Sequence, residues 1–316
     1  MRLETNISKA IDAIADVNAR YDSNVKWLLS DKQILARILK YTMQEFANEP
    51  IEYIITCISD VEVENIYVEP GLTNVGRVRG EAMEDAIPNE GKIVYDIRFS
   101  VIHKRAKIKI LINVEAQKST DPARLGYHLE NRVIYYLARM VSAQKETEFF
   151  HSDYDNIKRV RSIWICMDAG RDEEAIEEIS LYRKWIDCGD NNFADMDLIK
   201  GIIIKLRQRE GVKKSKNNLI SMLEDLLAQT EAEEKKENLK RYGIIMTEEI
   251  ERRLCDMCNL SEAIAEEAME KGIEKGIEKE CLSSIRKMLK KGYSGDEIKD
   301  VLEVSDSQLQ AAMKLN

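Results

Sequence analysis

The stretch that decides the fold is Lys92-Ile-Val-Tyr-Asp-Ile-Arg-Phe-Ser-Val101, which a short run separates from Lys107-Ile-Lys-Ile-Leu-Ile-Asn-Val-Glu-Ala-Gln117. Apolar and polar residues alternate in both runs, as they do in strands that bury one face. With a turn at 103–106, the two runs are predicted to form an antiparallel hairpin. Its polar face is expected to carry Asp96 on the first strand and Glu115 and Gln117 on the second.

The predicted turn also sets which residues face each other. A four-residue turn at 103–106 pairs Asp96 with Asn113 and leaves Glu115 one step diagonal to Asp96, at roughly 7–8 Å between backbones. Two carboxylates at that separation can share one Mg²⁺, a hard cation that takes one or two carboxylates besides waters and phosphate oxygens. The competing interpretation is a solvent-facing hairpin with ordinary exposed acids.

The segments around the hairpin predict an α/β core with a mixed sheet. The Ser30-Asp31-Lys32-Gln33 run matches a capping box with Ser30 at the cap. Thr120-Asp121-Pro122 indicates the start of a helix that continues to about residue 145. Arg161 to Met167 is expected to be a strand. The helix after Pro122 carries a basic stripe that could hold DNA phosphates, or could simply face solvent: Arg124, His128, Arg132 and Arg139.

The second half of the chain is predicted to be helical. We divide the chain into a core over 1–215, an acidic helical segment over 216–280 with a Glu-Lys-Gly-Ile repeat, and a small helical unit over 281–316. In that last unit, Ser294 and Ser305 are expected to cap helices. The spacing of Met246, Ile250, Leu254, Met257 and Ile264 indicates a face for self-association, or for packing on the core.

Charge and cysteine content limit the classes of function. The net charge is −9, yet residues 92–161 hold 14 Lys and Arg against 8 Asp and Glu, and residues 217–280 hold 9 against 17. A basic middle with an acidic tail is compatible with an enzyme of nucleic acids. Cys255 and Cys258 lack the second pair that a zinc site requires, so they are expected to be ordinary helix residues. With no long apolar run, we expect a cytoplasmic protein that does not enter the membrane.

These features also carry a family resemblance. Asp96, with a second strand that ends Asn-Val-Glu115-Ala-Gln117-Lys, resembles the Asp…Glu-x-Gln variant of the PD-(D/E)XK signature. It is similar in particular to the recombination-promoting nuclease or putative transposase group of that superfamily. The resemblance covers about residues 20–210 and includes further matching segments: Leu28–Ala36, Asn89–Lys92, Tyr95–Phe99, Ile134–Tyr136, Tyr154-Asp and Ser162–Cys166.

The resemblance implies a restriction-endonuclease-like core, a mixed central sheet flanked by helices, followed by an all-helical C-terminal region. It implies an endonuclease that hydrolyses DNA with Mg²⁺, or with Mn²⁺ as a substitute, in transposition or recombination. Asp96 and Glu115 would be the metal ligands, and Gln117 would stand where the superfamily usually has lysine. A neutral amide orients a water or a phosphate oxygen but supplies no charge.

Three points are not determined by the sequence. Lys118 could take over from Gln117 if a β-bulge turned it to the same face. A further acid is expected from upstream, with Asp31, Glu81, Glu84 and Glu90 as candidates. The chain could also be an inactive DNA- or protein-binding module that keeps the fold, or an interaction protein organised by its acidic helices, which are expected to permit a homo-oligomer.

Overall fold

The structure is a computed structural model of the 316-residue chain. It describes residues 6–59, 61–63, 84–87, 91–168, 174–183, 186, 196–207, 214–228, 230–302 and 304–314. The chain divides into two compact units. One is Asn18–Asn259, and the other combines Met1–Val17 with Leu260–Asn316.

A mixed sheet forms the centre of the larger unit, with β4 (Ile97–His103), β5 (Ile108–Ser119), β6 (Arg159–Asp168), β8 (Ile199–Lys205) and β7 (Ala175–Ser180) side by side in that order. The two-residue β1 (Glu62–Val63) extends the β4 edge. Neighbours β5, β6 and β8 run parallel, whereas β4 and β7 are antiparallel to theirs. A separate hairpin joins β2 (Glu84–Ile87) to β3 (Gly91–Val94). The predicted α/β core with a mixed sheet is therefore confirmed.

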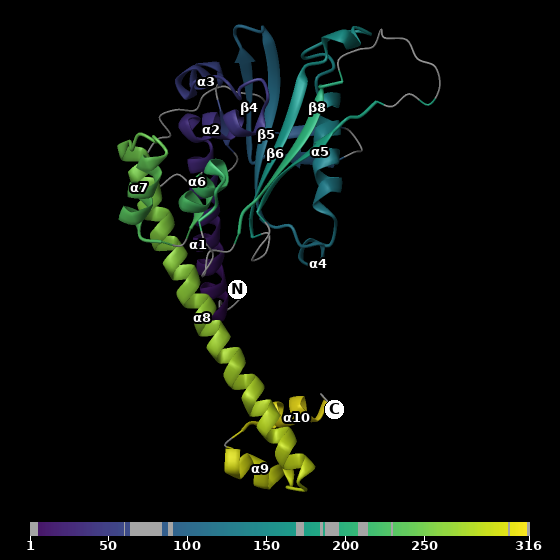
Figure 1. Ribbon diagram of the computed structural model, residues 1–316. Helices are drawn as coiled ribbons and strands as arrows, with labels where there is room; N and C mark the ends of the chain where they lie inside the picture. The colour runs from purple at the N-terminus through teal and green to yellow at the C-terminus, as the bar shows by residue number, and fades with distance from the viewer. Residues whose placement is uncertain are drawn as a thin grey trace, which may run out of the picture. The chain divides into compact units, whose positions relative to one another are not determined.

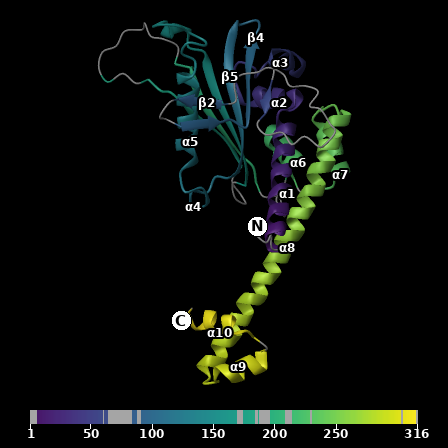
Figure 2. The same ribbon diagram turned by 180° about the vertical axis from the view of Figure 1, so that it is seen from behind.

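Helices cover both faces of this sheet (Figures 1 and 2). On one face lie α2 (Lys32–Thr42), α3 (Ile51–Cys57) and α6 (Asn218–Leu227), and on the other lies α5 (Leu129–Ser142). The remaining elements of the larger unit are part of α1 (Asn6–Leu29), α4 (Pro122–Leu125), a 3₁₀ turn at Tyr154–Asn156, α7 (Ala232–Arg241) and part of α8 (Glu248–Lys290).

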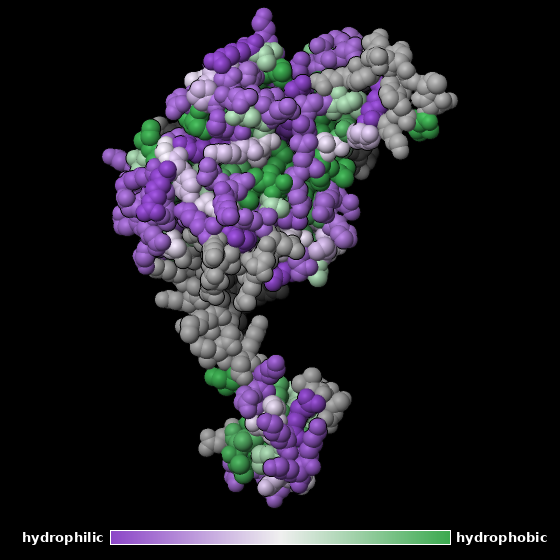
Figure 3. Space-filling view, viewed as in Figure 1, coloured by the Kyte–Doolittle hydropathy of each residue, from purple (hydrophilic) through white to green (hydrophobic). Residues whose placement is uncertain are grey.

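Alternation along the strands gives each face its own core. Ile112 and Val114 of β5 pack on the α2 side, whereas Leu111 packs with Leu137 of α5 on the other. Gly201 of β8 lets α5 approach closely, because a Cβ there would lie 2.4 Å from Val133 Cγ1. The middle of the polar face of the hairpin is thus covered, and Arg98, Ser100, Asn113 and Glu115 are buried there. Figure 3 shows a largely hydrophilic surface, with hydrophobic side chains in a strip over the middle of the sheet.

The register of the hairpin differs from the predicted one. The turn is Lys104–Lys107, with Lys107 at a φ of 56°, and Arg98 pairs with Asn113. The turn begins one residue late because His103 continues β4, where it is buried beside the Phe46 ring and its Nδ1 accepts the Ala106 N–H. Continuing this register past the start of β4 sets Asp96 opposite Glu115.

The predicted strand over 92–101 is also broken in its middle. Tyr95 and Asp96 belong to neither β3 nor β4, and Tyr95 packs in the α5-side core while Ile97 packs on the opposite side. The backbone N–H of Asp96 donates to a side chain, the carboxylate of Glu115. Because of this interruption, residues 91–94 pair in a separate hairpin with β2, and Asp96 lies at a bend.

Two predicted helix boundaries need correction, and others are confirmed. Asp31, not Ser30, caps α2 by accepting the Gln33 N–H, since the Ser30 hydroxyl bonds to the Trp27 carbonyl at the end of α1. Asp121 caps α4 with Pro122 in its first turn, as predicted. That helix stops at Gly126, whose φ of 79° is left-handed, and α5 starts only at Leu129.

The helices after residue 216 do not all stand apart from the core. Leu219, Leu223, Leu239, Ile250 and Leu254 are buried in the same cluster as β4 and β5. Of the face that suggested self-association, Met246, Ile250, Leu254 and Met257 pack in this core, as the alternative interpretation expected, whereas the side chain of Ile264 lies outside the described residues. Cys258 of α8 is buried and donates to the Thr230 carbonyl.

The C-terminal part of the other unit contains the end of α8, α9 (Gly295–Leu302) and α10 (Asp306–Lys314), which share a small core of Ile285, Ile298, Leu309 and Ala312. Ser294 and Ser305 form the predicted capping boxes with Glu297 and Gln308. Across the described ranges, no helix is both long and apolar enough to cross a membrane.

Candidate active site

Asp96 and Glu115 meet at the start of β4, beside the carboxyl end of β5. The Asp96 N–H donates to Glu115 Oε1 at 3.2 Å, and the Ala116 N–H donates to Asp96 Oδ2 at 3.0 Å. Each carboxylate thus accepts a hydrogen bond from the backbone of the segment that carries the other acid. Crevices at the carboxyl ends of parallel strands are where open α/β sheets usually bind ligands, and β5 and β6 end together here.

Glu115 is the buried member of the pair. Glu115 as a whole is 3% exposed, whereas the side chain of Asp96 is 16% exposed, and the Asn113 amide donates to Glu115 Oε1 at 3.0 Å. Burial, and then the charge of Asp96, raise the pKa of Glu115 to about 8, although the hydrogen bonds and the charge of Arg132 act in the opposite direction. Such a carboxyl holds its proton near neutral pH until a cation replaces it.

A lysine that the sequence analysis missed completes this cluster. Lys26 of α1 places its Nζ 2.8 Å from Asp96 Oδ1 and 3.0 Å from Asp22 Oδ2, with its side chain only 12% exposed. Burial alone would lower the pKa of Lys26, but the two carboxylates raise it overall. In sequence, Asp22 and Lys26 form an i,i+4 pair of the kind that many surface helices carry, so nothing singled them out.

Of the expected upstream acids, the structure describes the side chain of Asp31 alone. Asp31 serves as the cap of α2, and burial raises its pKa despite its hydrogen bonds. Glu81, Glu90 and the side chain of Glu84 lie outside the described residues. Asp22 reaches the acid pair instead, through Lys26.

Gln117 lies two residues beyond Glu115 on the same face of β5, half-buried and paired in register with Cys166. The register between β5 and β6 stays constant from Ile110 to Ser119, so no bulge turns Lys118 inward. Lys118 is exposed on the opposite face. The bulge that would have brought Lys118 to the acids is therefore ruled out.

Arg132 covers the site from α5 and is not a solvated cation. It donates to the hydroxyls of Tyr127 and Tyr136, both at 2.9 Å, and its guanidinium lies 5.1 Å from the ring centroid of Trp164. Trp164 of β6 is paired in register with Glu115. Arg132 therefore lies over the rings of Tyr136 and Trp164, beside the buried acid, and its charge lowers the pKa of Glu115.

The predicted basic stripe on α4 and α5 is only partly a surface. Arg124 is 66% exposed and pairs with Asp168 at 3.1 Å, and His128 is exposed at the first cap of α5. Arg139, by contrast, is 3% exposed. The expectation that Arg139 shares an open face with Arg124 and His128 is therefore wrong. Steps of four and seven keep His128, Arg132 and Arg139 on one stripe of the helix, and the burial of this stripe increases along α5.

The donor set suits Mg²⁺ better than a metal that demands several protein ligands. Among the described side chains, no three His, Cys, Asp or Glu residues converge on one point. Both hydrogen bonds of the Glu115 carboxylate fall on Oε1, so Oε2 would be the oxygen that it offers to an ion. Asp96 would share that ion through an oxygen that also contacts Lys26 or the Ala116 N–H. Two carboxylates and several waters are a normal Mg²⁺ environment.

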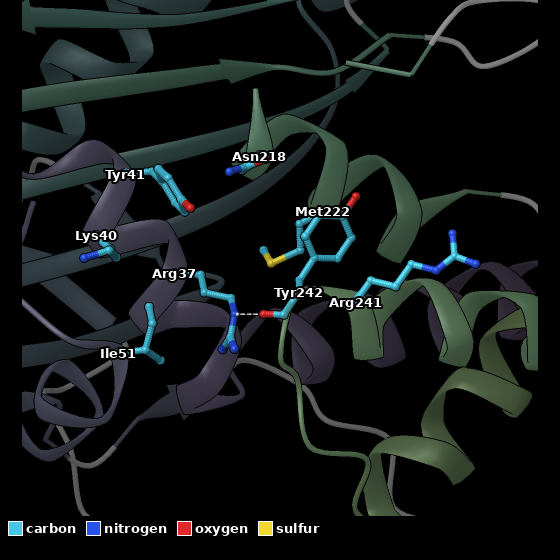
Figure 4. A pocket seen from close by; sticks show the side chains of 8 residues that line it. All are labelled: Arg37, Lys40, Tyr41, Ile51, Asn218, Met222, Arg241 and Tyr242. Atoms are coloured by element: carbon cyan, nitrogen blue, oxygen red, sulfur yellow. Dashed lines mark hydrogen bonds between the residues drawn. The ribbon is translucent and has the colours of Figure 1, made fainter. Parts of the chain in front are cut away.

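A separate cavity of about 360 Å³ contains none of these residues (Figure 4). Its lining is Arg37, Lys40, Tyr41, Ile51, Asn218, Met222, Arg241 and Tyr242. Arg37 donates to the carbonyls of Gln33, Tyr242 and Gly243, and Lys40 to those of Ala47 and Glu49. These cations join α2 to the loops around it, so the acid cluster is the stronger candidate for chemistry.

No family model, curated protein or solved structure matches the chain.

Proposed function

We propose that this protein is a Mg²⁺-dependent DNA endonuclease of the PD-(D/E)XK kind, as its resemblance to the recombination-promoting nuclease or putative transposase group implies. One observation carries the proposal. Asp96 and Glu115 are locked together by backbone hydrogen bonds at the carboxyl edge of β5, within a strand–strand–helix–strand order. A buried carboxyl whose pKa is raised beside a second acid is typical of functional sites.

In this proposal each residue of the site has its own role in hydrolysis. Bound by Asp96 and Glu115, Mg²⁺ would activate a water molecule and neutralise charge on the scissile phosphate. Asn113 and the Asp96 N–H keep the Glu115 carboxylate in place through Oε1. Gln117, on the same face, can accept from and donate to the attacking water or a phosphate oxygen. Arg132 and its aromatic neighbours keep bulk water from the α5 side of Glu115.

The surface that would meet DNA is the start of α4 and α5, which follows β5 directly. Arg124 and His128 are exposed there, together with Tyr127. Phosphate contacts from such side chains set the position of a duplex without reading its sequence. This proposal therefore places the backbone of DNA across the carboxyl edge of the sheet.

The direct test is incubation of supercoiled plasmid with the purified chain in Mg²⁺, in Mn²⁺ and in EDTA. Nicked or linear product is expected with either metal and none with EDTA. Absence of any product with both metals, across DNA and RNA substrates, would remove the nuclease proposal. Retained DNA binding in that case would support the second candidate, an inactive binding module, which the neutral Gln117 at the lysine position favours.

Gln117 offers a sharper prediction about the active face. Gln117→Ala should slow cleavage about 10-fold or more through lost positioning of water or phosphate, with little change in metal affinity. Gln117→Lys should keep or raise activity, since it adds positive charge where negative charge develops. Single-turnover rates at saturating Mg²⁺ measure both effects. Lys118→Ala is the matched control and should be silent; a severe Lys118 variant with a silent Gln117→Ala would contradict the assignment.

Arg124 and Arg139 make a matched pair for the DNA surface. Arg124→Ala should weaken DNA binding and lower the dependence of log K on log salt by about 1 unit, because one exposed phosphate contact is lost. Arg139→Ala should leave that slope unchanged and destabilise the fold by about 1–3 kcal/mol, since Arg139 is buried. Binding titrations at several salt concentrations and thermal melts separate the two, and an unchanged slope for Arg124→Ala would count against this surface.

A further inference from the structure

The contacts of Lys26 are those of a cation that bridges two acids. Its Nζ lies 2.8 Å from Asp96 Oδ1 and 3.0 Å from Asp22 Oδ2, from a side chain that is 12% exposed. An ammonium held at hydrogen-bond distance by two carboxylates occupies the kind of position that a divalent ion takes when two acids share it. The two oxygens of Asp96 thus have different partners: Oδ1 contacts Lys26, and Oδ2 accepts the N–H of Ala116, the residue after Glu115.

The charges around Lys26 also favour a role for it as a cation of the site. Asp96 lies between two other charged groups, with Glu115 on one side and Lys26 on the other, and Lys26 contacts Asp22 as well. Gln117 adds no charge at the position where the family resemblance implies a lysine. Phosphodiester hydrolysis develops negative charge that fixed cations stabilise, either as metal ions or as side chains.

We propose that Lys26 is the built-in second cation of this site. It fills the position between Asp22 and Asp96, limits the chain to one divalent ion at Asp96 and Glu115, and supplies to the scissile phosphate the charge that Gln117 lacks. The proposal rests on the proposed nuclease function for its last part only. Its first two parts concern cation binding and stand independently of catalysis.

The first experiment counts bound ions. Mn²⁺ binding to the full chain is measured by isothermal titration calorimetry and by electron paramagnetic resonance, for the wild type, K26M and the double variant D22N/K26M. One ion is expected in the wild type, two in K26M, and one again when Asp22 is also neutralised. Lys118→Met is the control for loss of an exposed lysine and should bind one ion. A single ion in folded K26M overturns the proposal; K26Q replaces K26M if circular dichroism shows that the latter is unfolded.

The second experiment follows cleavage. At Mg²⁺ concentrations that saturate the wild type, K26M should cleave plasmid at least 100-fold more slowly while DNA affinity changes less than 3-fold. K26R, which keeps the charge, should retain most of the rate. The rate of K26M should recover as the second ion binds, which a purely structural role for Lys26 would not produce. Wild-type rates in K26M would overturn the phosphate role, and a wild type that cleaves nothing would instead refute the proposed function and leave the ion count to stand.

Discussion

Asp96→Asn and Glu115→Gln are each expected to reduce Mg²⁺-dependent cleavage of plasmid DNA by at least 100-fold while leaving the fold intact. Both replacements are isosteric, so they create no cavity, and the amide oxygen of either can still accept the backbone or Asn113 hydrogen bond of the native carboxylate. What each removes is one of the two charges available to the metal. Loss of a single electrostatic contact in an active site typically lowers the rate about 100- to 1000-fold.

The matched control for these variants is Asp155→Asn. Asp155 is an exposed acid in the 3₁₀ turn at Tyr154–Asn156, which precedes β6 at the end of that strand away from Trp164, the residue paired with Glu115. The Asp155→Asn variant should cleave plasmid at the wild-type rate. Metal affinity from calorimetry and melting temperature should accompany the rates. Full activity in Asp96→Asn or Glu115→Gln would dismiss the acid pair as the metal centre, even if the chain proved to be a nuclease.

The metal-free protein is expected to lose stability as the pH rises from about 5 to 8, and Glu115→Gln should abolish that part of the loss. The pKa of Glu115 is about 8 in the folded chain and close to 4.5 when unfolded, so between these values the folded state binds one more proton. Stability then falls with pH, by up to about 1.4 kcal/mol per unit. The stabilising contribution is complete below pH 4.5 and is gone once the pH has passed 8.

Urea unfolding in EDTA at several pH values measures this effect as the difference between wild type and Glu115→Gln. A difference that does not change between pH 5 and 8 would show that Glu115 is already ionised in the folded chain. Saturating Mg²⁺ should remove the pH dependence of the wild type, because a divalent ion takes the place of the proton. Lys26 adds nothing in this range, since its pKa is raised from an already higher value.

The strands of the hairpin and the face shared by Glu115 and Gln117 could be predicted because alternation is a local signal. Apolar residues at even positions of β5 and polar residues at odd positions specify the two faces without knowledge of the partners. The register could not be fixed in the same way. It depended on His103, whose burial beside Phe46 of a distant segment extends β4 by one residue.

The carboxylates of the site were predictable, but their surroundings were not. Asn113 and Glu115 are polar, and alternation alone leaves open whether water or a helix covers them; α5 covers them because Gly201 of β8 admits Val133. Lys26 was missed because its contact with Asp96 joins segments far apart in the chain. Arg139 was misplaced because helical spacing sets it on the same stripe as His128 and Arg132, whereas the tertiary packing that buries this end of the stripe is not a local signal.

The separation of these contacts along the chain bears on the kinetics of folding. Asp96 and Glu115 are only 19 residues apart and belong to one hairpin, which closes quickly because its loop is short. Lys26 reaches them only when α1 docks, a contact with a much larger loop-closure entropy. The two acids are therefore expected to meet before their counter-ion arrives. In that interval the site is a pair of like charges, and docking of α1 is the step that relieves their repulsion.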